Sequence, residues 1–212
     1  ESLSYEDGSI IACAAGTAYS AIRKLGSIDG EGYFTVLGLG PVGLSAALLA
    51  QGQGWKTIGI DTKEYRINYA KEMGITALDG SSFQNLAQSL QSISGSPTVL
   101  RVFDSTGSEA GLEAALRLTA PEGGIVTVGK GMWPLRFSQT IDVADLIRKQ
   151  ILFMGSWVYP ISYYWDIVTA LTTNDIHLDR MITGRFPLEK AQEAFEFANN
   201  PKTVGKAVLV MD

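Results

Sequence analysis

Three glycines at fixed spacing are the feature of this sequence most suited to binding a ligand. They lie in the segment GLGPVG at residues 38–43, between the apolar run 33–37 and the apolar stretch 44–50. In a strand–turn–helix unit, the first glycine permits the tight turn. The second lets the backbone approach a pyrophosphate, and the third lets the helix pack on the strand. The segment therefore predicts a dinucleotide site at a helix N-terminus; the alternative is a plain tight turn.

An acidic residue follows the next apolar run. Residues 56–60 predict a second strand that ends on Asp61, about 20 residues after the glycines. A carboxylate there accepts hydrogen bonds from the adenosine ribose hydroxyls and repels a 2′-phosphate, which favours NAD over NADP. Two alternatives stay open. Asp61 could simply end the strand and cap the next helix, and Arg66 is the residue type that accommodates the phosphate of NADP.

Short apolar runs alternate with helical patterns, which predicts a parallel sheet covered by helices on both faces. Helices are expected behind Ser82 and Ser108, and the turn APEGG at 120–124 is expected to separate the second helix from the fifth strand. The predicted strands are 33–37, 56–60, 77–78, 99–104, 125–129 and 151–155. The predicted fold class is α/β, a Rossmann fold with a doubly wound six-stranded parallel sheet.

Both ends of the chain lie outside this unit. Residues 9–25 predict an apolar helix, Pro187 is expected to open a helix, and residues 206–211 predict a strand that has no place in the sheet. We divide the chain into an inter-domain helix segment (1–26), an NAD-binding domain (27–184) and a C-terminal helix and strand (185–212). The terminal segments are expected to belong with a catalytic domain that is absent. Apolar surface should then be exposed and favour self-association. The residues expected at that surface are Ile10, Ile11, Tyr19, Phe195 and Val208.

Composition excludes several function classes. The chain has 212 residues, a formal net charge of -5 and one cysteine, and it is 46% hydrophobic. The negative charge argues against a nucleic-acid partner, and the single cysteine excludes an internal disulfide and favours a reducing compartment. The longest early apolar run, Ile10–Ala15, is too short to cross a membrane.

Four segments together resemble the zinc-type medium-chain alcohol and polyol dehydrogenases. They are ACAAGTAY (12–19), GLGPVG (38–43), LFMGSW (152–157) and ITGRFPLEKA (182–191), and the resemblance covers nearly the whole chain. The glycine loop alone is shared with unrelated dehydrogenases, whereas the four in this order are far more specific. The resemblance implies a cytoplasmic, NAD-dependent oxidoreductase with zinc and a small-molecule alcohol substrate. It also implies a homodimer, or a higher homo-oligomer, joined through the edge of the sixth strand.

The resemblance also implies roles for individual residues. Cys13 would be the third protein ligand of zinc in an intact enzyme, and the alternative is an inert buried cysteine. Thr17 would lie near the nicotinamide, unless its hydroxyl bonds back to its own helix. Arg66 would flank the adenosine ribose with NAD still preferred, and the backbone at Met154 and Gly155 would face the nicotinamide carboxamide.

Further candidates lie where predicted strands end, because ligands bind at the carboxyl ends of parallel strands. Thr106 and Gly107 follow the fourth strand, and Val128 and Gly129 end the fifth. Ordinary turn chemistry is the alternative for each pair. The candidate cofactor-binding residues are, in chain order, Thr17, Gly38, Gly40, Pro41, Val42, Gly43, Asp61, Arg66, Thr106, Gly107, Val128, Gly129, Met154 and Gly155.

The sequence departs from the family pattern in what it lacks. The family's catalytic domain supplies two zinc ligands, the proton relay and most of the substrate pocket, and no such segment is present. Cys13 alone cannot complete a tetrahedral zinc site, and the single histidine, His177, lies in a polar turn rather than at a strand end. We expect this chain to bind cofactor, with Lys206 as a further contact to the pyrophosphate, and to be inactive alone.

Two other functions remain open. Zinc-free quinone and enoyl reductases share the fold, use NADPH and need no cysteine at position 13. A stand-alone domain that senses NAD without doing chemistry is the second alternative.

Overall fold

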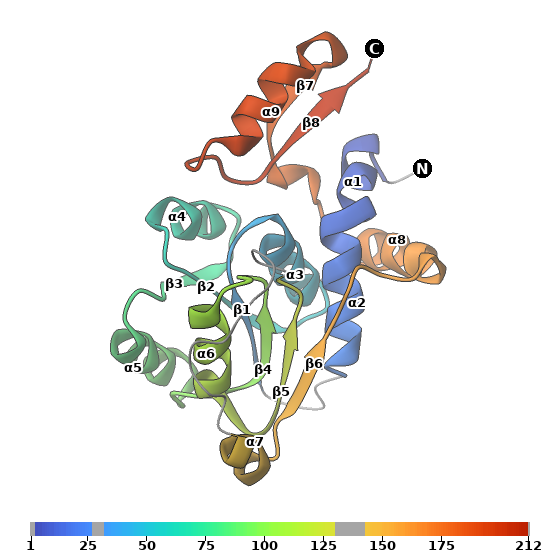
Figure 1. Cartoon of the computed structure of the whole chain (residues 1–212). Helices are drawn as coiled ribbons and strands as arrows, with labels where there is room; N and C mark the ends of the chain where they lie inside the picture. The colour runs from blue at the N-terminus through green and yellow to red at the C-terminus, as the bar shows by residue number, and fades with distance from the viewer. Residues whose placement is uncertain (1–2, 27–31, 130–142, 212) are drawn as a thin grey trace.

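The structure is a computed structural model that describes residues 3–26, 32–129 and 143–211. Six parallel strands form the main sheet in the order β3-β2-β1-β4-β5-β6 (Figure 1). They are β1 (Tyr33–Leu37), β2 (Lys56–Asp61), β3 (Thr76–Asp79), β4 (Val99–Asp104), β5 (Thr119–Thr127) and β6 (Leu152–Gly155). The predicted α/β class with a doubly wound, six-stranded parallel sheet is confirmed.

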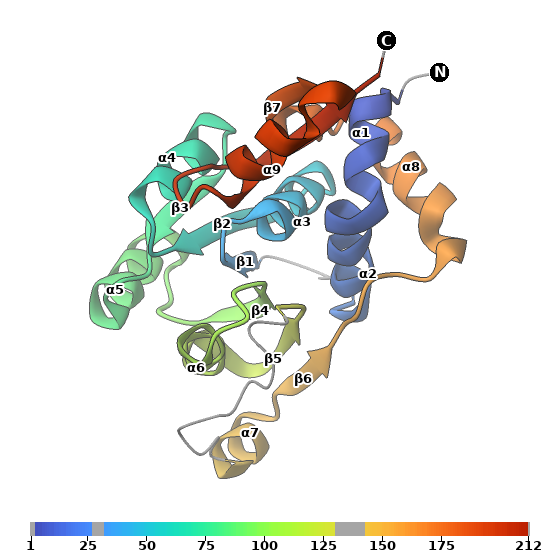
Figure 2. The same ribbon diagram turned by 45° about the horizontal axis from the view of Figure 1, so that its top comes forward.

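Helices cover both faces of the sheet because side chains alternate between the faces along each strand. Phe34 and Val36 belong to a core shared with α3 and α4, whereas Leu37 belongs to a core shared with α5 and α6. Figure 2 shows α3 and α6 on opposite sides of the sheet. The helices are α3 (Pro41–Gly52), α4 (Glu64–Glu72), α5 (Phe83–Ser94), α6 (Glu109–Leu118), α7 (Val143–Lys149) and α8 (Tyr164–Thr173).

The strand order reverses at β1. This strand pairs in parallel with β2 on one side and with β4 on the other. The connections that leave the carboxyl ends of β1 and β4 therefore diverge to opposite faces, and the gap between them is where ligands bind in open α/β sheets.

The fifth strand begins earlier than predicted. β5 starts at Thr119, and its register with β4 jumps from Val99↔Thr119 to Arg101↔Gly124. The predicted turn is present as a bulge inside the strand, with Glu122 at a φ of 60°. A bulge interrupts regular pairing locally without ending the strand. Turn-forming residues at 120–124 are therefore compatible with a bulge as well as with a turn between a helix and a strand.

The N-terminal segment is one continuous helical rod. It comprises α1 (Tyr5–Ile10), a π-helical turn (Ile11–Ala15) and α2 (Gly16–Lys24), which agrees with the predicted helix over 9–25. The rod packs against α3 and α8 (Figure 1). Ile10 and Ile11 are 0% exposed and Tyr19 is 9% exposed. The expectation that these three side chains would be exposed is therefore wrong, because α3 and α8 already bury them.

A small separate unit ends the chain. It contains β7 (Ile182–Pro187), a 3₁₀ turn (Leu188–Lys190), α9 (Ala191–Asn199) and β8 (Lys206–Val210), and we call it the C-terminal unit. β8 pairs in parallel with β7, which answers the question of where the last strand finds a partner. The predicted helix opened by Pro187 is wrong in detail, because Pro187 ends a strand and the 3₁₀ turn precedes the helix. Phe195 is 65% exposed, as expected, and Val208 is half-buried.

Two acidic residues of α1 hold the N-terminal rod to later parts of the chain: Glu6 contacts the C-terminal unit, and Asp7 contacts the segment just before it. Glu6 accepts two hydrogen bonds from the Arg185 guanidinium, at 2.6 and 2.7 Å. Asp7 is 5% exposed, and its Oδ1 accepts from the backbone N–H groups of Leu178 and Asp179, both at 2.9 Å.

None of the helices in the described residues combines the length and apolarity needed to cross a lipid bilayer.

The Glu6–Arg185 pair predicts a pH-dependent attachment. Hydrogen bonds from Arg185 lower the pKa of Glu6 below its usual value of 4.5. A lowered pKa in the folded state contributes stability above the usual pKa, and that stability is lost as the pH falls through the lowered value. We expect Glu6→Gln to lower the free energy of unfolding at pH 7, with a difference from wild type that shrinks on acidification below pH 4.5.

Urea denaturation at a series of pH values measures this difference. Glu193→Gln is the control, because Glu193 forms an exposed pair with Lys190 on the same unit. A Glu6→Gln difference that stays constant from pH 7 to pH 3 would contradict the assignment.

Candidate functional site

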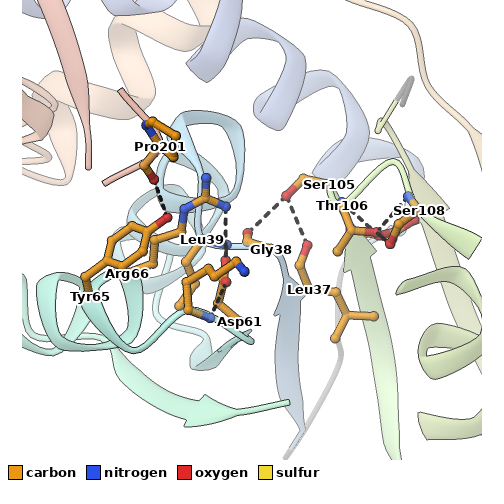
Figure 3. Close-up of polar contacts among 12 residues, drawn as sticks. Leu37, Gly38, Leu39, Asp61, Tyr65, Arg66, Ser105, Thr106, Ser108 and Pro201 are labelled. Atoms are coloured by element: carbon orange, nitrogen blue, oxygen red, sulfur yellow. Dashed lines mark hydrogen bonds and ion pairs between the residues drawn. The ribbon is translucent and has the colours of Figure 1, made fainter. Parts of the chain in front are cut away.

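The carboxyl ends of the strands meet at one edge of the main sheet. The glycine loop leaves β1 and Asp61 ends β2 (Figure 3), and Asp104 ends β4. The C-terminal unit lies beyond this edge (Figure 1). The predicted glycines, the predicted acid and the residues after the fourth strand are thus brought together at one place.

Two of the three glycines are required by the fold itself. Gly38 has a φ of 87°, which residues with a side chain rarely adopt. A Cβ on Gly43 would lie 1.8 Å from the carbonyl oxygen of Gly38, so the helix could not approach the strand with any larger residue there. These are the turn and packing roles expected of the first and third glycines.

Gly40 has no such requirement among the residues that the structure describes. Its φ is -74°, which any residue adopts, and a Cβ on it would meet no heavy atom within 4 Å. Gly40 is the N-cap of α3, and it has no side chain to accept from the first N–H groups of the helix. By contrast, Ser4, Ser82 and Ser108 cap α1, α5 and α6. Open space and uncapped donors therefore coincide at the start of α3, which also carries Pro41 and Val42 in its first turn.

The carboxylate of Asp61 connects the glycine loop to the start of α4. Asp61 is 7% exposed, its Oδ2 accepts from the Leu39 N–H at 2.8 Å, and its Oδ1 accepts from the Lys63 N–H at 2.9 Å. The Arg66 guanidinium lies 3.6 Å from Oδ2. Asp61 thus ends the strand, as one alternative had it, but the N-cap of α4 is Lys63 and not Asp61. Two carboxylate oxygens can accept about four hydrogen bonds, so capacity remains for a ligand hydroxyl.

A cavity of 380 Å³ opens between Asp61 and the β4–α6 connection. It is lined by both faces of the crevice, including apolar side chains from β1, β2, α5 and α6. The lining residues are Leu37, Gly38, Gly40, Ile60, Asp61, Thr62, Lys63, Arg66, Gly80, Leu86, Ser105, Thr106, Ser108, Ala110, Gly111 and Ala114. A mostly apolar slot with a carboxylate at its rim suits a flat ring system attached to a sugar.

Asp104 organises the turn after β4. It is 1% exposed, and its Oδ1 accepts from the backbone N–H of Thr106 at 3.0 Å and from the Thr106 hydroxyl at 2.7 Å. Its Oδ2 accepts from the Thr127 hydroxyl at 3.0 Å. Thr106 also lines the cavity. Because its hydroxyl donates to Asp104, its position agrees both with the predicted place in a cleft and with ordinary turn chemistry.

Ser105 is a residue of this site that sequence reasoning missed. Its hydroxyl lies 3.0 Å from the carbonyl oxygens of both Leu37 and Gly38, which ties the β4 turn to the glycine loop (Figure 3). A serine in a turn is common, so the residue type gave no signal. Only the position of Ser105 directly after the end of β4 could have indicated a role at the site.

Gly107 and Gly129 lie against each other. Gly107 has a φ of 61°, and a Cβ on Gly129 would lie 2.1 Å from the Gly107 nitrogen. The Val128 N–H donates to the Asp104 carbonyl at 2.9 Å. These residues are at the same sheet edge but outside the lining of the 380 Å³ cavity. Lys130, the next residue, lies outside the described residues.

The remaining candidates lie on the β6 and α2 side of the edge. Met154 pairs with Val126, and a Cβ on Gly155 would meet no atom within 4 Å. The Lys24 ammonium donates to the Gly155 carbonyl at 3.2 Å. Thr17 is 9% exposed, and the alternative of a hydroxyl that bonds back to its own helix is not observed among the described residues.

Zinc does not fit the described residues. Cys13 is exposed, in the π-helical turn, so the alternative of an inert buried cysteine is wrong. In the described part of the chain, the only clustered ligand-type residues are Asp7, His177 and Asp179, without Cys13. Asp7 already accepts hydrogen bonds on both oxygens, and His177 is an exposed partner of Asp175 at 3.1 Å. A tetrahedral zinc site needs ligands that these residues do not provide.

Comparison with known proteins identifies the family of this chain. A model of the family described as zinc-binding dehydrogenase matches residues 41–174. The uncharacterized zinc-type alcohol dehydrogenase-like protein YphC of Escherichia coli (strain K12) is 34% identical over 99% of this chain and 58% of its own length. Sorbitol dehydrogenase 1 of Saccharomyces cerevisiae is 28% identical over 93% of this chain and 56% of its own length.

A solved structure has the same fold. The short chain alcohol dehydrogenase rspB from E. coli CFT073, in complex with the cofactor NADH, superposes with a TM-score of 0.82 at 21% identity and covers all of this chain. The chain spans 56–61% of the length of these three proteins. Since the family match alone extends over more than half of the sequence, this chain belongs to the zinc-binding dehydrogenases.

Proposed function

We propose that this chain binds NAD(H) along the carboxyl edge of its main sheet. In this proposal it is the cofactor-binding part of an NAD-dependent, zinc-type alcohol or polyol dehydrogenase. The observation that carries the proposal is Gly40, because no contact or backbone angle among the described residues accounts for a glycine at this position. A ligand backbone or phosphate that approaches α3 closely accounts for it directly.

The proposed cofactor crosses the edge from the cavity toward β6. The adenine and its ribose occupy the 380 Å³ cavity, with the ribose hydroxyls at Asp61 and beside Arg66. The pyrophosphate lies on the first turn of α3, where the N–H groups of Val42 and Gly43 are not capped by a side chain. The nicotinamide half then extends toward Thr17, Gly107, Val128, Gly129, Met154 and Gly155.

Asp61 supports NAD as the preferred cofactor. The buried carboxylate would oppose a second phosphate at the ribose, and the nearest cation, Arg66, already faces that carboxylate at 3.6 Å. Lys63 and Arg66 both line the cavity, however, and they are the feature that favours the NADPH-dependent reductase as the alternative.

The proposed reaction of the longer enzyme is hydride transfer between nicotinamide and an alcohol carbon. Sorbitol dehydrogenases among the relatives favour a polyol as the substrate class. Cys13 would supply one zinc ligand only together with residues outside this chain. Because alcohol oxidation also needs a group to take the hydroxyl proton, the 212-residue chain should bind cofactor without turnover.

We further propose a homodimer formed through β6, in the cytoplasm. β6 is an edge strand of the main sheet, and its Leu152 and Phe153 side chains are 54% and 39% exposed. An exposed apolar edge strand is a surface that a second copy can extend.

Titration of the purified chain with NADH and with NADPH, followed by quenching of tryptophan fluorescence, tests the proposed function. We expect saturable binding of NADH and binding of NADPH that is at least about tenfold weaker, since a 2′-phosphate would meet the buried carboxylate of Asp61. Preference for NADPH would move the assignment to the zinc-free reductases. Absence of binding to both would contradict the proposal.

Gly40→Val tests the observation on which the proposal depends. The added Cβ meets no atom of the described residues within 4 Å, so we expect the free energy of unfolding to change by no more than about 1 kcal/mol. The added side chain would occupy the path of the pyrophosphate, and NADH affinity should fall by more than about tenfold. Gly8→Ala is the control, because Gly8 has equally open surroundings on α1. Equal loss of affinity in both variants, or none in Gly40→Val, would contradict the role of Gly40.

A further inference from the structure

The first turn of α4 faces two parts of the molecule at once. Arg66 lies in the lining of the cavity and 3.6 Å from Asp61. The neighbouring Tyr65 contacts the C-terminal unit, because its hydroxyl donates to the Pro201 carbonyl at 2.5 Å (Figure 3). The Arg66 guanidinium lies 5.9 Å from the centre of the Tyr65 ring. The helix that holds the proposed ribose site is therefore also bonded to the C-terminal unit.

Pro201 belongs to a turn, residues 200–205, that leads directly into β8. The turn is held inside the C-terminal unit by several hydrogen bonds. The Thr203 hydroxyl donates to the Phe197 carbonyl at 2.7 Å, and the Thr183 hydroxyl donates to the Val204 carbonyl at 2.5 Å. Because the turn is braced in this way, a bond to Pro201 fixes the place of the whole turn and of the residue after it, Lys206.

The far end of the turn lies close to α3. A Cβ on Gly205 would be 2.2 Å from the carbonyl oxygen of Met181, so the backbone passes directly against Met181. The Met181 sulfur lies 3.6 Å from the hydroxyl of Ser45, on the second turn of α3. Met181 thus connects the residue before Lys206 to α3, whose first turn is the proposed position of the pyrophosphate.

From these contacts we infer that Tyr65 is a positioning residue for the cofactor. Its hydroxyl holds the 200–205 turn so that Lys206 stands beside the pyrophosphate bound at the first turn of α3. The inference rests on the proposed function, because it assigns the cavity and α3 to the two ends of one dinucleotide. Tyr65 itself touches the turn and not the cofactor, so its effect is carried by Lys206.

The inference predicts different effects on the binding of two ligands that both contain adenosine, NADH and AMP. NADH has a pyrophosphate and needs Lys206 in place, whereas AMP fills the cavity, bonds to Asp61 and carries a single phosphate. Removing the Tyr65 hydroxyl leaves the ring, Arg66 and Asp61 unchanged. A general loss of structure in α4 would weaken the binding of both ligands. A displacement confined to the 200–205 turn would weaken the binding of NADH alone.

Tyr65→Phe in the full chain tests this, with Tyr69→Phe as the matched control. Tyr69 lies one turn further along α4 and donates to the Arg180 carbonyl at 2.8 Å, outside the 200–205 turn. Calorimetry gives the dissociation constants of NADH and AMP for each variant. Hydrogen exchange of the amides in residues 200–206, with and without NADH, reports on the turn itself.

We expect Tyr65→Phe to weaken NADH by about threefold to tenfold, as for one lost hydrogen bond, with AMP unchanged. NADH should slow exchange at residues 200–206 in wild type and Tyr69→Phe, and less so in Tyr65→Phe. Unchanged NADH affinity, or equal weakening of both ligands, would overturn the inference while leaving the proposed function intact. Failure of wild type to bind NADH would overturn both.

Discussion

The buried carboxylate of Asp61 is the interaction on which the candidate site depends. It receives the Leu39 N–H from the glycine loop and the Lys63 N–H from the start of α4, and it faces Arg66. One side chain thus fixes the turn that begins α3, the helix that carries Tyr65 and the rim of the cavity. A charge in this position is tolerated only because donors surround it, and those donors are backbone groups whose own places the sheet determines.

The glycines at the carboxyl edge of the sheet fall into two groups: those that the fold requires and those that it does not. Gly38, Gly43, Gly107 and Gly129 are explained by a positive φ or by contact with neighbouring backbone. Gly40 and Gly155 are not, since a side chain on either would point into open space. This contrast is physical and does not depend on similarity to other proteins. In the proposed function these are the two points where the cofactor comes close, one at the start of α3 and one at the end of β6.

Strands and the site's backbone could be predicted from sequence because both follow from local patterns. Apolar runs of strand length located the main sheet, and the spacing from the glycines to Asp61 located the crevice. The contacts between distant segments could not be predicted in this way. The Ser105 bonds to the glycine loop, the Tyr65 bond to Pro201 and the burial of Ile10 and Ile11 all depend on which elements become neighbours. The burial was mispredicted because the apolar helix was expected to face an absent catalytic domain and therefore to be exposed to solvent. Instead, α3 and α8 cover it.

A crystal structure of the chain with NADH tests the central claim most directly. The account predicts the adenosine ribose within hydrogen-bond distance of Asp61, the pyrophosphate over Gly40 at the first turn of α3, and the nicotinamide on the side of Gly155. It would be contradicted by a dinucleotide bound away from this edge, or by one whose phosphates leave the space above Gly40 empty.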